Sequence, residues 1–276
     1  MKIDSHHHFW DYSSEQYGWI NDEMSVLKQD FGPSQLLDHS ASAGITGVVS
    51  VQARQTLEET TWLLDIAKSA EIVRGVVGWV PLRDANVRAD IEKLSHDENL
   101  KGVRHVVQDE PDDAFILGKE FNEGVSVLKD YGLVYDILIF AKHLPNSIKF
   151  VDQHPDQRFV LDHIAKPTVK EAEFDSGWKA NMLELAKREN VTCKFSGVVT
   201  EVRDEDWSNN TIRPYWDVAL EAFGPNRLMY GSDWPVCLLR SSYSRWFETV
   251  DRFASELTTQ EQQSFWVDNA TKAYSL

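Results

Sequence analysis

The sequence lacks the features that mark secreted, disulfide-rich and membrane-spanning proteins. Its 276 residues include only two cysteines, Cys193 and Cys237, so no disulfide framework can form and we expect both as reduced thiols in the core. No apolar run approaches the ~18 residues that a membrane-spanning helix needs, and the longest, residues 133–141, is interrupted by Asp136. The N-terminus carries no apolar segment of the kind that directs export, so a cytoplasmic protein is expected.

Basic residues are also scarce relative to acidic ones. The chain has 28 Lys and Arg against 44 Asp and Glu, which gives a formal net charge of −16. Such an excess of carboxylates repels phosphate backbones and anionic lipid, so nucleic acid and membrane surfaces are not expected partners. A small molecule remains as the expected partner, and the composition leaves open whether the chain forms a homo-oligomer.

What the sequence does contain is a series of short segments rich in Val, Ile and Leu, each followed by polar residues, glycine or proline. Nearly continuous apolar character of this kind is typical of strands buried on both faces, as in parallel sheets. Eight strands are predicted on this basis, at residues 2–5, 47–53, 72–81, 101–107, 133–140, 158–162, 191–196 and 227–231.

Helical patterns with recognisable ends lie between these segments. Thr56 and Glu59 have the spacing of a capping box ahead of an apolar helical face. Asp84 and Asp175 each precede apolar residues at helical spacing, as N-cap residues do. The last stretch, residues 258–276, is expected to be a closing helix.

The alternation of strands and helices over the whole chain predicts an α/β fold. Eight strand and helix units in about 250 residues match the number and length expected of a (β/α)8 TIM barrel. A doubly wound open sheet is the main competitor, but no GxGxxG or GxxxxGK motif follows an early strand. No linker or change of composition divides the chain, so residues 1–276 are expected to form one barrel domain with its active site at the C-terminal ends of the strands.

Histidine, aspartate and other polar residues gather at these predicted strand ends. The residues that would meet at one mouth are His6, His7, His8, His105, His163, Lys194, Ser196 and Asp233. Since side chains alternate along a strand, Asp4, His6 and His8 are expected on one face and His7 on the other. Two imidazoles at this spacing can approach one ion or one carbonyl group from inside the barrel.

Five short motifs occur at these strand ends in a fixed order. They are DxHxHFW at residues 4–10, GVRH at 102–105, DHIAKP at 162–167, KFSG at 194–197 and GSDWP at 231–235. Together they resemble the amidohydrolase superfamily and, within it, the group of sugar lactonases and 2-pyrone-4,6-dicarboxylate lactonase. A lone HxH is weak evidence, whereas the ordered set ending in GSDWP is specific. The resemblance implies a (β/α)8 fold and hydrolysis of a cyclic ester.

The same resemblance implies roles for particular residues. His6, His8, His163 and Asp233 would line the centre and hold one divalent metal, and zinc suits this set of neutral nitrogens and one carboxylate. Lactonases of this group also act without metal, in which case the histidines would polarise the lactone carbonyl. In both versions Asp233 would be the general base for water. Binuclear members use a carboxylated lysine after the fourth strand, where this chain has His105, so a second metal is not expected.

Other residues near strand ends are candidates for binding the substrate. They are Lys28, Gln52, His105, Lys194 and Trp234, together with Trp10, and they offer hydrogen bonds or an apolar face to a polyhydroxylated ring. A dianionic pyrone would favour several arginines at the mouth, but the predicted positions of Arg54, Arg74, Arg104 and Arg203 do not converge. The preferred substrate is therefore an L-fucono, L-rhamnono or galactono type lactone, hydrolysed to its aldonic acid.

Four other functions remain open. A 2-pyrone-4,6-dicarboxylate lactonase and a metal-dependent decarboxylase of aromatic acids would reuse the same His and Asp residues. A hydrolase with Cys237 as nucleophile is less favoured, because no histidine lies beside it in the sequence. A noncatalytic metal- or sugar-binding barrel would leave Asp233 idle, and the intact polar set argues against that.

Overall fold

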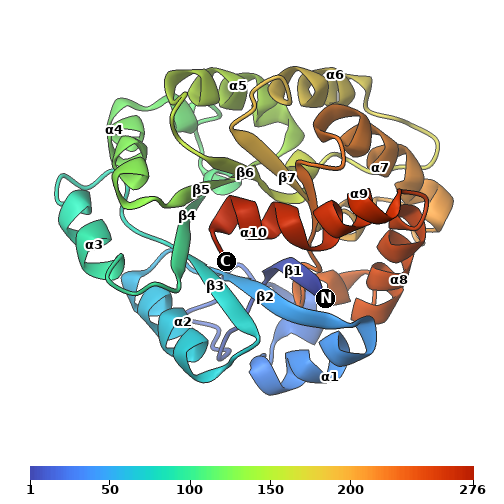
Figure 1. Ribbon diagram of the computed structural model, residues 1–276, viewed down its shortest axis with the longest axis horizontal. Coiled ribbons are helices and arrows are strands. Elements are labelled where there is room, and N and C mark those ends of the chain that lie inside the picture. Colours follow the sequence, from blue (N-terminus) through green and yellow to red (C-terminus); the bar gives the residue numbers. More distant parts are fainter.

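The computed structural model describes residues 1–276 and contains one sheet of eight parallel strands. Each strand pairs with the next along the chain, so the spatial order runs from β1 to β8 (Figure 1). The strands are β1 (Lys2–His7), β2 (Ile45–Val51), β3 (Val73–Gly78), β4 (Leu100–Val106), β5 (Val134–Leu138), β6 (Phe159–Leu161), β7 (Val191–Phe195) and β8 (Leu228–Tyr230). The predicted (β/α)8 barrel is confirmed, and each predicted strand overlaps an observed one.

The barrel closes between β1 and the segment that follows β8. The backbone N–H of Asp233 donates to the carbonyl of His6 at 2.8 Å, and that of His8 donates to the carbonyl of Trp234 at 2.7 Å. His7 and Trp234 form an isolated parallel bridge at the same place. The seam of the barrel therefore runs through the two motifs that carry His6, His8 and Asp233.

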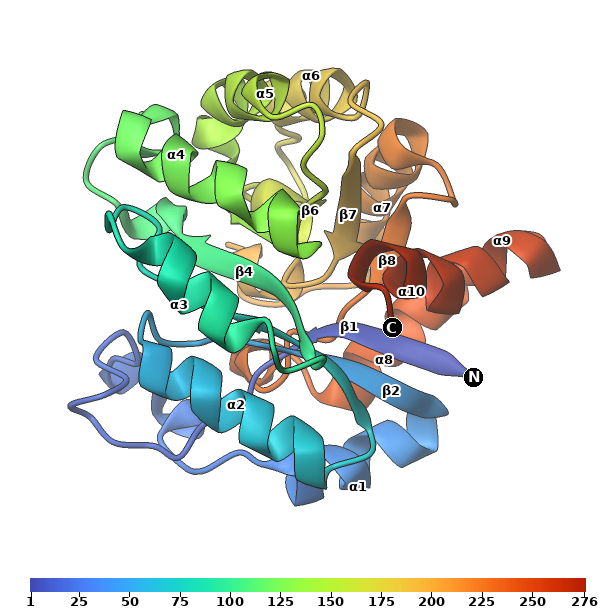
Figure 2. The ribbon, with the colours of Figure 1, turned by 60° about the vertical axis from the view of Figure 1, so that its left-hand side comes forward.

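Helices form the outer layer of the barrel (Figures 1 and 2). They are α1 (Pro33–Ala43), α2 (Leu57–Ser69), α3 (Val87–Leu94), α4 (Lys119–Leu128), α5 (Leu144–Gln153), α6 (Ser176–Leu185), α7 (Asn209–Phe223) and α8 (Tyr243–Ala254). Each helix follows one strand, because the chain must return to the other end of the sheet before the next parallel strand begins.

The predicted helix starts are partly confirmed. Thr56 caps α2 by accepting the N–H of Glu59, and Asp175 caps α6 by accepting the N–H of Trp178. The second hydrogen bond of the predicted capping box, from the Thr56 N–H to the Glu59 side chain, is not formed, so that part of the prediction was wrong. The Glu59 carboxylate instead accepts the N–H groups of Ala53 and Arg54 in the loop before α2. Asp84 was also wrong as a cap: α3 begins after Asn86, and Asp84 accepts the N–H of that residue.

The C-terminal segment lies across one end of the barrel, as Figure 1 shows. It consists of α9 (Thr259–Gln263), a π-helical turn over Ser264–Asp268, and α10 (Asn269–Tyr274). Lys101 and Arg158, which lie at the starts of β4 and β6, donate to carbonyls of Ser275 and Ala273 at 3.1 Å each. The segment therefore covers the N-terminal ends of the strands and leaves the C-terminal ends to the loops.

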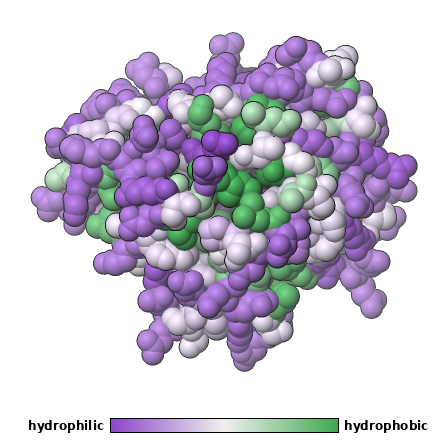
Figure 3. Space-filling view, turned by 60° about the horizontal axis from the view of Figure 1, so that its bottom comes forward, coloured by the Kyte–Doolittle hydropathy of each residue, from purple (hydrophilic) through white to green (hydrophobic).

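A large apolar core fills the space between strands and helices. Both cysteines are buried and free, as predicted. Hydrophilic residues cover most of the face drawn in Figure 3, and hydrophobic residues show as a strip near its centre. None of the helices has both the length and the apolar character needed to cross a membrane.

Glu59 generates a prediction about stability and pH. Its Oε2 accepts the N–H groups of Ala53 and Arg54 at 3.0 and 2.7 Å, and burial raises its pKa to about 7. The folded state thus binds more protons than the unfolded state, so stability is lost as pH rises from the usual glutamate pKa of 4.5 to about 7. We expect Glu59→Gln to abolish this loss, which amounts to about 3 kcal/mol at 1.36 kcal/mol per unit.

Urea unfolding at pH 5 and pH 7.5, an interval that contains most but not all of this loss, measures the effect as a difference between variant and wild type. The matched control is Glu58→Gln, which changes an exposed neighbour on the same turn of α2. Equal pH dependence in wild type and Glu59→Gln would contradict the assignment.

Candidate active site

Four polar side chains meet at the C-terminal ends of β1, β6 and β8. The Nε2 atoms of His6 and His8 are 3.3 Å apart, and Asp233 Oδ1 lies 3.4 Å from His8 Nε2 and 3.8 Å from His6 Nε2. His163 Nε2 lies 3.9 Å from the same Asp233 oxygen. All four side chains are buried. The structure thus brings together the four residues that the sequence assigned to the centre.

Asp4 does not share their position, contrary to the alternation expected along the first strand. The pairing of β1 with β2 is irregular between Asp4 and His7, so the simple two-residue period is broken there. Asp4 accepts the Ser232 N–H at 2.8 Å and the hydroxyl of Tyr243, on α8, at 3.1 Å. It therefore ties β1 to the outer layer of the barrel.

The histidine rings are oriented by partners on their far nitrogens. His8 Nδ1 lies 2.8 Å from the carbonyl of Val51, which can only accept, so this nitrogen carries the proton. His163 Nδ1 lies 2.8 Å from Ser196 Oγ. With Nδ1 of His8 protonated, its Nε2 presents a lone pair to Asp233, as metal-binding histidines do.

Burial keeps these histidines neutral. It lowers the pKa of His163 to about 4 and that of His6 well below its usual value, and the pKa of His8 also falls. Burial alone would raise the pKa of Asp233, but the positive charge that His163 and His8 carry when protonated and the charge of Lys166 outweigh it, so the pKa falls. Near neutral pH the site consists of three neutral imidazoles and one carboxylate.

This donor set fits one divalent metal ion. Zinc bonds of ~2.1 Å in a tetrahedral site place the ligand atoms about 3.4 Å apart. The separations among His6 Nε2, His8 Nε2 and Asp233 Oδ1 are 3.3, 3.4 and 3.8 Å. Lone pairs that face one another at these distances repel unless a proton or a cation lies among them.

Two segments of the site have unusual backbone conformations. His163, Ile164, Ala165 and Lys166 have φ values of 54°, 47°, 61° and 45°, and Asp233 has a φ of 55°. A left-handed residue other than glycine costs roughly 1–2 kcal/mol. The turn is held by burial of Ile164 and by a hydrogen bond from Trp178 Nε1 to the Ile164 carbonyl at 2.7 Å.

A network of buried charges lies beneath His6. Lys194 Nζ is 2.6 Å from Asp136 and 2.9 Å from Asp162, and Arg104 donates to Asp162 at 3.0 Å. His6 Nδ1 lies 3.2 Å from Asp162 and 3.1 Å from Lys194. Burial would raise the pKa of Asp162, but the charges of Lys194 and Arg104 help to hold it well below its usual value. Lys194 is fully enclosed here, beneath the mouth.

The same network argues against a second metal. His6, Asp162 and His163 also lie close enough to share an ion. However, the Asp162 carboxylate is already in contact with two cations, Arg104 and Lys194. A third cation at this carboxylate would meet their repulsion at close range. The residues present therefore do not fit a two-metal centre.

The other predicted substrate-binding residues are dispersed. Gln52 is buried and bonds to Arg104, and Lys28 pairs with Asp22. The Trp234 ring is fully buried against Phe9 and Phe31, so protein covers both of its faces.

Trp10 is likewise enclosed. Its Nε1 donates to the carbonyls of Leu27 and Gln29 at 3.3 and 2.9 Å, and its ring is fully buried. Cys237 is buried as well, and burial holds the pKa of its thiol well above the usual value, so it offers no nucleophilic thiolate.

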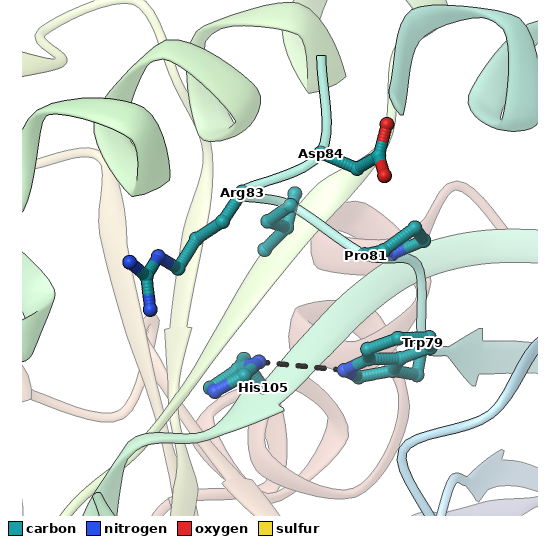
Figure 4. A pocket seen from close by; sticks show the side chains of 6 residues that line it. Trp79, Pro81, Arg83, Asp84 and His105 are labelled. Carbon is teal, nitrogen blue, oxygen red and sulfur yellow. Dashed lines mark hydrogen bonds between the residues drawn. The ribbon is translucent and has the colours of Figure 1, made fainter. Parts of the chain in front are cut away.

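His105 lies on a cavity of about 370 Å³ that is separate from the histidine cluster in its contacts. Figure 4 shows its ring approached by Trp79, whose Nε1 donates to Nδ1 at 3.3 Å. Its Nε2 is 2.7 Å from Glu110, and its ring stacks on Phe115. His105 is thus held by the loops after β3 and β4.

Arg104 is the functional-site residue that sequence reasoning missed. It donates to His6 Nε2 at 3.3 Å and bonds to the backbone and side chain of Gln52. The signal was present in GVRH, because Arg104 and His105 are neighbours on one strand and must face opposite ways. The sequence alone did not say which of the two faces the centre.

Comparison with known proteins places this arrangement among relatives. The sequence model of the family described as amidohydrolase matches residues 3–276. An L-fucono-1,5-lactonase from Burkholderia multivorans is 39% identical over 100% of this chain and 96% of its own length. Another from Burkholderia ambifaria is 35% identical over 92% of this chain and 89% of its own. The crystal structure of an amidohydrolase from Burkholderia multivorans with bound zinc has a TM-score of 0.94 at 39% identity, covering 100% of this chain and 99% of that one.

Substitution of Gly197 tests whether close packing around this residue fixes the position of the His163 ring. Its φ is 63°, and a Cβ there would lie 2.5 Å from His163 Nδ1. Gly132 has a φ of 68° with no atom within 4 Å of its would-be Cβ, so it isolates the cost of backbone conformation. We expect Gly132→Ala to lose about 1 kcal/mol of unfolding free energy. We expect Gly197→Ala to lose about 3 kcal/mol, because a steric clash adds to the strain. Urea unfolding measures both, and equal losses would contradict the clash.

Proposed function

Because the chain belongs to the amidohydrolase family, we propose that it hydrolyses a sugar lactone of the L-fucono, L-rhamnono or galactono type to the aldonic acid. The coarser activity, a hydrolase acting on lactones, is supported by relatives at 39% and 35% identity that carry the name L-fucono-1,5-lactonase. The observation that carries the proposal is the meeting of an ionised Asp233 with three neutral histidines at the mouth of the barrel.

Asp233 is the residue we assign to proton transfer. Its lowered pKa keeps it ionised, so it can accept a proton from water as the water oxygen bonds to the acyl carbon. The bond between the acyl carbon and the ring oxygen then breaks, and Asp233 returns the proton to the leaving ring oxygen. Atoms balance as one water added for each lactone opened. The new acid ionises near neutral pH, which releases one proton to solvent.

His6, His8 and Asp233 are the residues we assign to a single zinc ion, with His163 beside them. Zinc, when bound, supplies Lewis-acid assistance to acyl cleavage. The chain's own part is orientation: Val51 and Ser196 hold the far nitrogens of His8 and His163. A relative at 39% identity with bound zinc supports the choice of metal.

The arginine contacts favour a neutral sugar lactone over a pyrone dicarboxylate. Recognition of two carboxylates calls for free guanidinium groups. Arg104 is engaged by Asp162, and Arg203 is engaged by Glu201 at 2.7 Å. A dianion would have to displace these acidic partners. A polyhydroxylated neutral ring needs no such exchange.

Activity on a panel of lactones tests the proposed reaction. We expect proton release in weak buffer with L-fucono-, L-rhamnono- and galactonolactone, and none with 2-pyrone-4,6-dicarboxylate. Asp233→Asn should lower kcat by about 10²–10⁴-fold, because the amide cannot accept the proton. Asp206→Asn, at an exposed aspartate, is the matched control. Turnover of the pyrone alone would overturn the substrate class, and a nearly unchanged kcat in Asp233→Asn would overturn the general base.

Elemental analysis tests the metal assignment separately from activity. We expect one equivalent of zinc per chain after loading and dialysis. His8→Ala should hold far less, because it removes a ligand nitrogen. His96→Ala, at a histidine outside the site, should retain the full equivalent. Two equivalents in wild type would contradict the argument from Arg104 and Lys194.

A further inference from the structure

A second cavity, of about 590 Å³, lies among the segments that follow β5, β6 and β7. Its size is within the range of small-molecule sites. The lining residues that bear on the argument are Phe140, Lys166, Trp178, Asn181, Glu201 and Arg203. None of these residues was assigned a role from the sequence.

The cavity is joined to the cluster through the left-handed turn. The turn begins at His163 and ends at Lys166, whose N–H donates to the His163 carbonyl at 2.8 Å. Burial raises the pKa of Asp233, and the charge of Lys166 is one of the effects that lower it. The turn thus carries His163 of the cluster at its start and Lys166 of the cavity wall at its end.

Lys166 is the one cation of the cavity wall that lacks an ion pair. Lys142 pairs with Asp113 at 2.7 Å, and Arg203 pairs with Glu201 at 2.7 Å. The Lys166 ammonium lies 5.8 Å from the centre of the Phe140 ring and makes no hydrogen bond within the chain. Lys166 is half-buried and lies on the strained turn. Burial raises the pKa of Glu201, on the same wall, and the charge of Lys166 partly offsets this rise.

Glu201 is the complementary group on the same wall. Its side chain is 8% exposed, and one oxygen, Oε2, is bound by Arg203. The other oxygen, Oε1, receives no donor from the protein. Asn181 lines the cavity with a half-buried amide. The cavity thus offers one unpaired donor near Asp233 and unpaired acceptors farther along.

We propose that this cavity binds the sugar ring of the lactone, with Lys166 donating to the acyl oxygen and Glu201 accepting from ring hydroxyls. The proposal rests on the lactonase function proposed above and names the residues that give it specificity. Lys166 is a catalytic residue in this scheme, because negative charge grows on the acyl oxygen as water adds. Glu201 is a specificity residue, because a carboxylate left without hydroxyl partners disfavours a plain ring.

Arg104 and Lys194 cannot take the place of Lys166. Both cations are held by carboxylates in the network beneath His6, and Lys194 is fully buried. Withdrawing Lys194 would leave the buried Asp136 without a cation, which is strongly unfavourable, and the charge of Arg104 is shared with Asp162. Lys166 has no such tie.

Two lactones and two matched pairs of variants test the proposal. The substrates are L-fuconolactone and δ-valerolactone, which has the ester ring without hydroxyl groups. The variants are Lys166→Met and Glu201→Gln, and their controls are Lys170→Met and Glu173→Gln. Lys170 and Glu173 pair with each other at 2.9 Å on the surface of the same loop. Thermal unfolding of each variant identifies any that fail to fold.

We expect Lys166→Met to lower kcat by about 10²–10³-fold on both lactones, and Lys166→Arg to restore part of it. Glu201→Gln should lower kcat/KM by about 10–100-fold on L-fuconolactone and leave δ-valerolactone within about twofold. The controls should match wild type. Equal loss on both lactones in Glu201→Gln, or kcat within about twofold in a folded Lys166→Met, would overturn the proposal.

Calorimetric titration with L-fuconate separates this proposal from the proposed function. The carboxylate of this aldonic acid carries the former acyl oxygen, so Lys166→Met should weaken its binding by about tenfold or more. A wild type that opens no lactone yet binds L-fuconate through Lys166 would refute the lactonase function and uphold the cavity. L-fuconate binding that is absent, or equal in wild type and Lys166→Met, would overturn the cavity assignment whatever the activity.

Discussion

The candidate site depends on how the barrel closes. β1 and the segment after β8 are joined by two backbone hydrogen bonds, from Asp233 to His6 and from His8 to Trp234. His6, His8 and Asp233, which direct their side-chain lone pairs into the site, are thus also the residues that close the barrel. Backbone pairing therefore sets the distance of the Asp233 carboxylate from the two imidazoles. Asp4 strengthens the same junction by binding the N–H of Ser232. In a closed barrel the first and last strands are positioned by the pairing of all the strands between them. The hydrogen bonds that close the sheet therefore also bring the site residues together.

The buried ions beneath the seam serve orientation more than stability. Taking Arg104, Lys194, Asp136 and Asp162 out of water costs free energy that their mutual attraction repays only with good geometry. They hold the His6 ring from two sides, because Asp162 Oδ1 lies 3.2 Å from its Nδ1 and Arg104 donates to its Nε2 at 3.3 Å. Tyr274 of α10 donates to Asp136 at 2.7 Å, so the C-terminal helix that covers the barrel floor contacts the same network. The two cations also hold the carboxylate that a second metal would need.

The fold and the centre of the site could be predicted because each follows from a local rule. Strands buried on both faces are apolar throughout, and polar residues at their ends stand out as candidates. The resemblance to a known family selected His6, His8, His163 and Asp233 among them. The failures arise where the chain departs from local rules. An irregularity in β1 turned Asp4 away, and the choice between Arg104 and His105 needed the register of β4. The left-handed turn from His163 to Lys166 had no sequence signal, because it contains no glycine and is held by distant packing against Trp178.

Charge connects the whole molecule to the proposed reaction. A neutral lactone feels little of the field of a chain with net charge −16, whereas its product is an anion that this field repels. A site that bound the anionic product strongly would release it slowly. An acidic protein with few unpaired cations at the mouth of the barrel therefore favours release of the aldonic acid. Lys166 and Arg83 are the exceptions that line the two cavities without an ion pair, and in the proposed scheme Lys166 meets the acyl oxygen as it acquires charge. One ammonium provides transition-state attraction while the surrounding carboxylates limit its hold on the finished acid. The scarcity of free cations at the mouth, which argues against a dicarboxylate substrate, therefore also favours turnover of a neutral one.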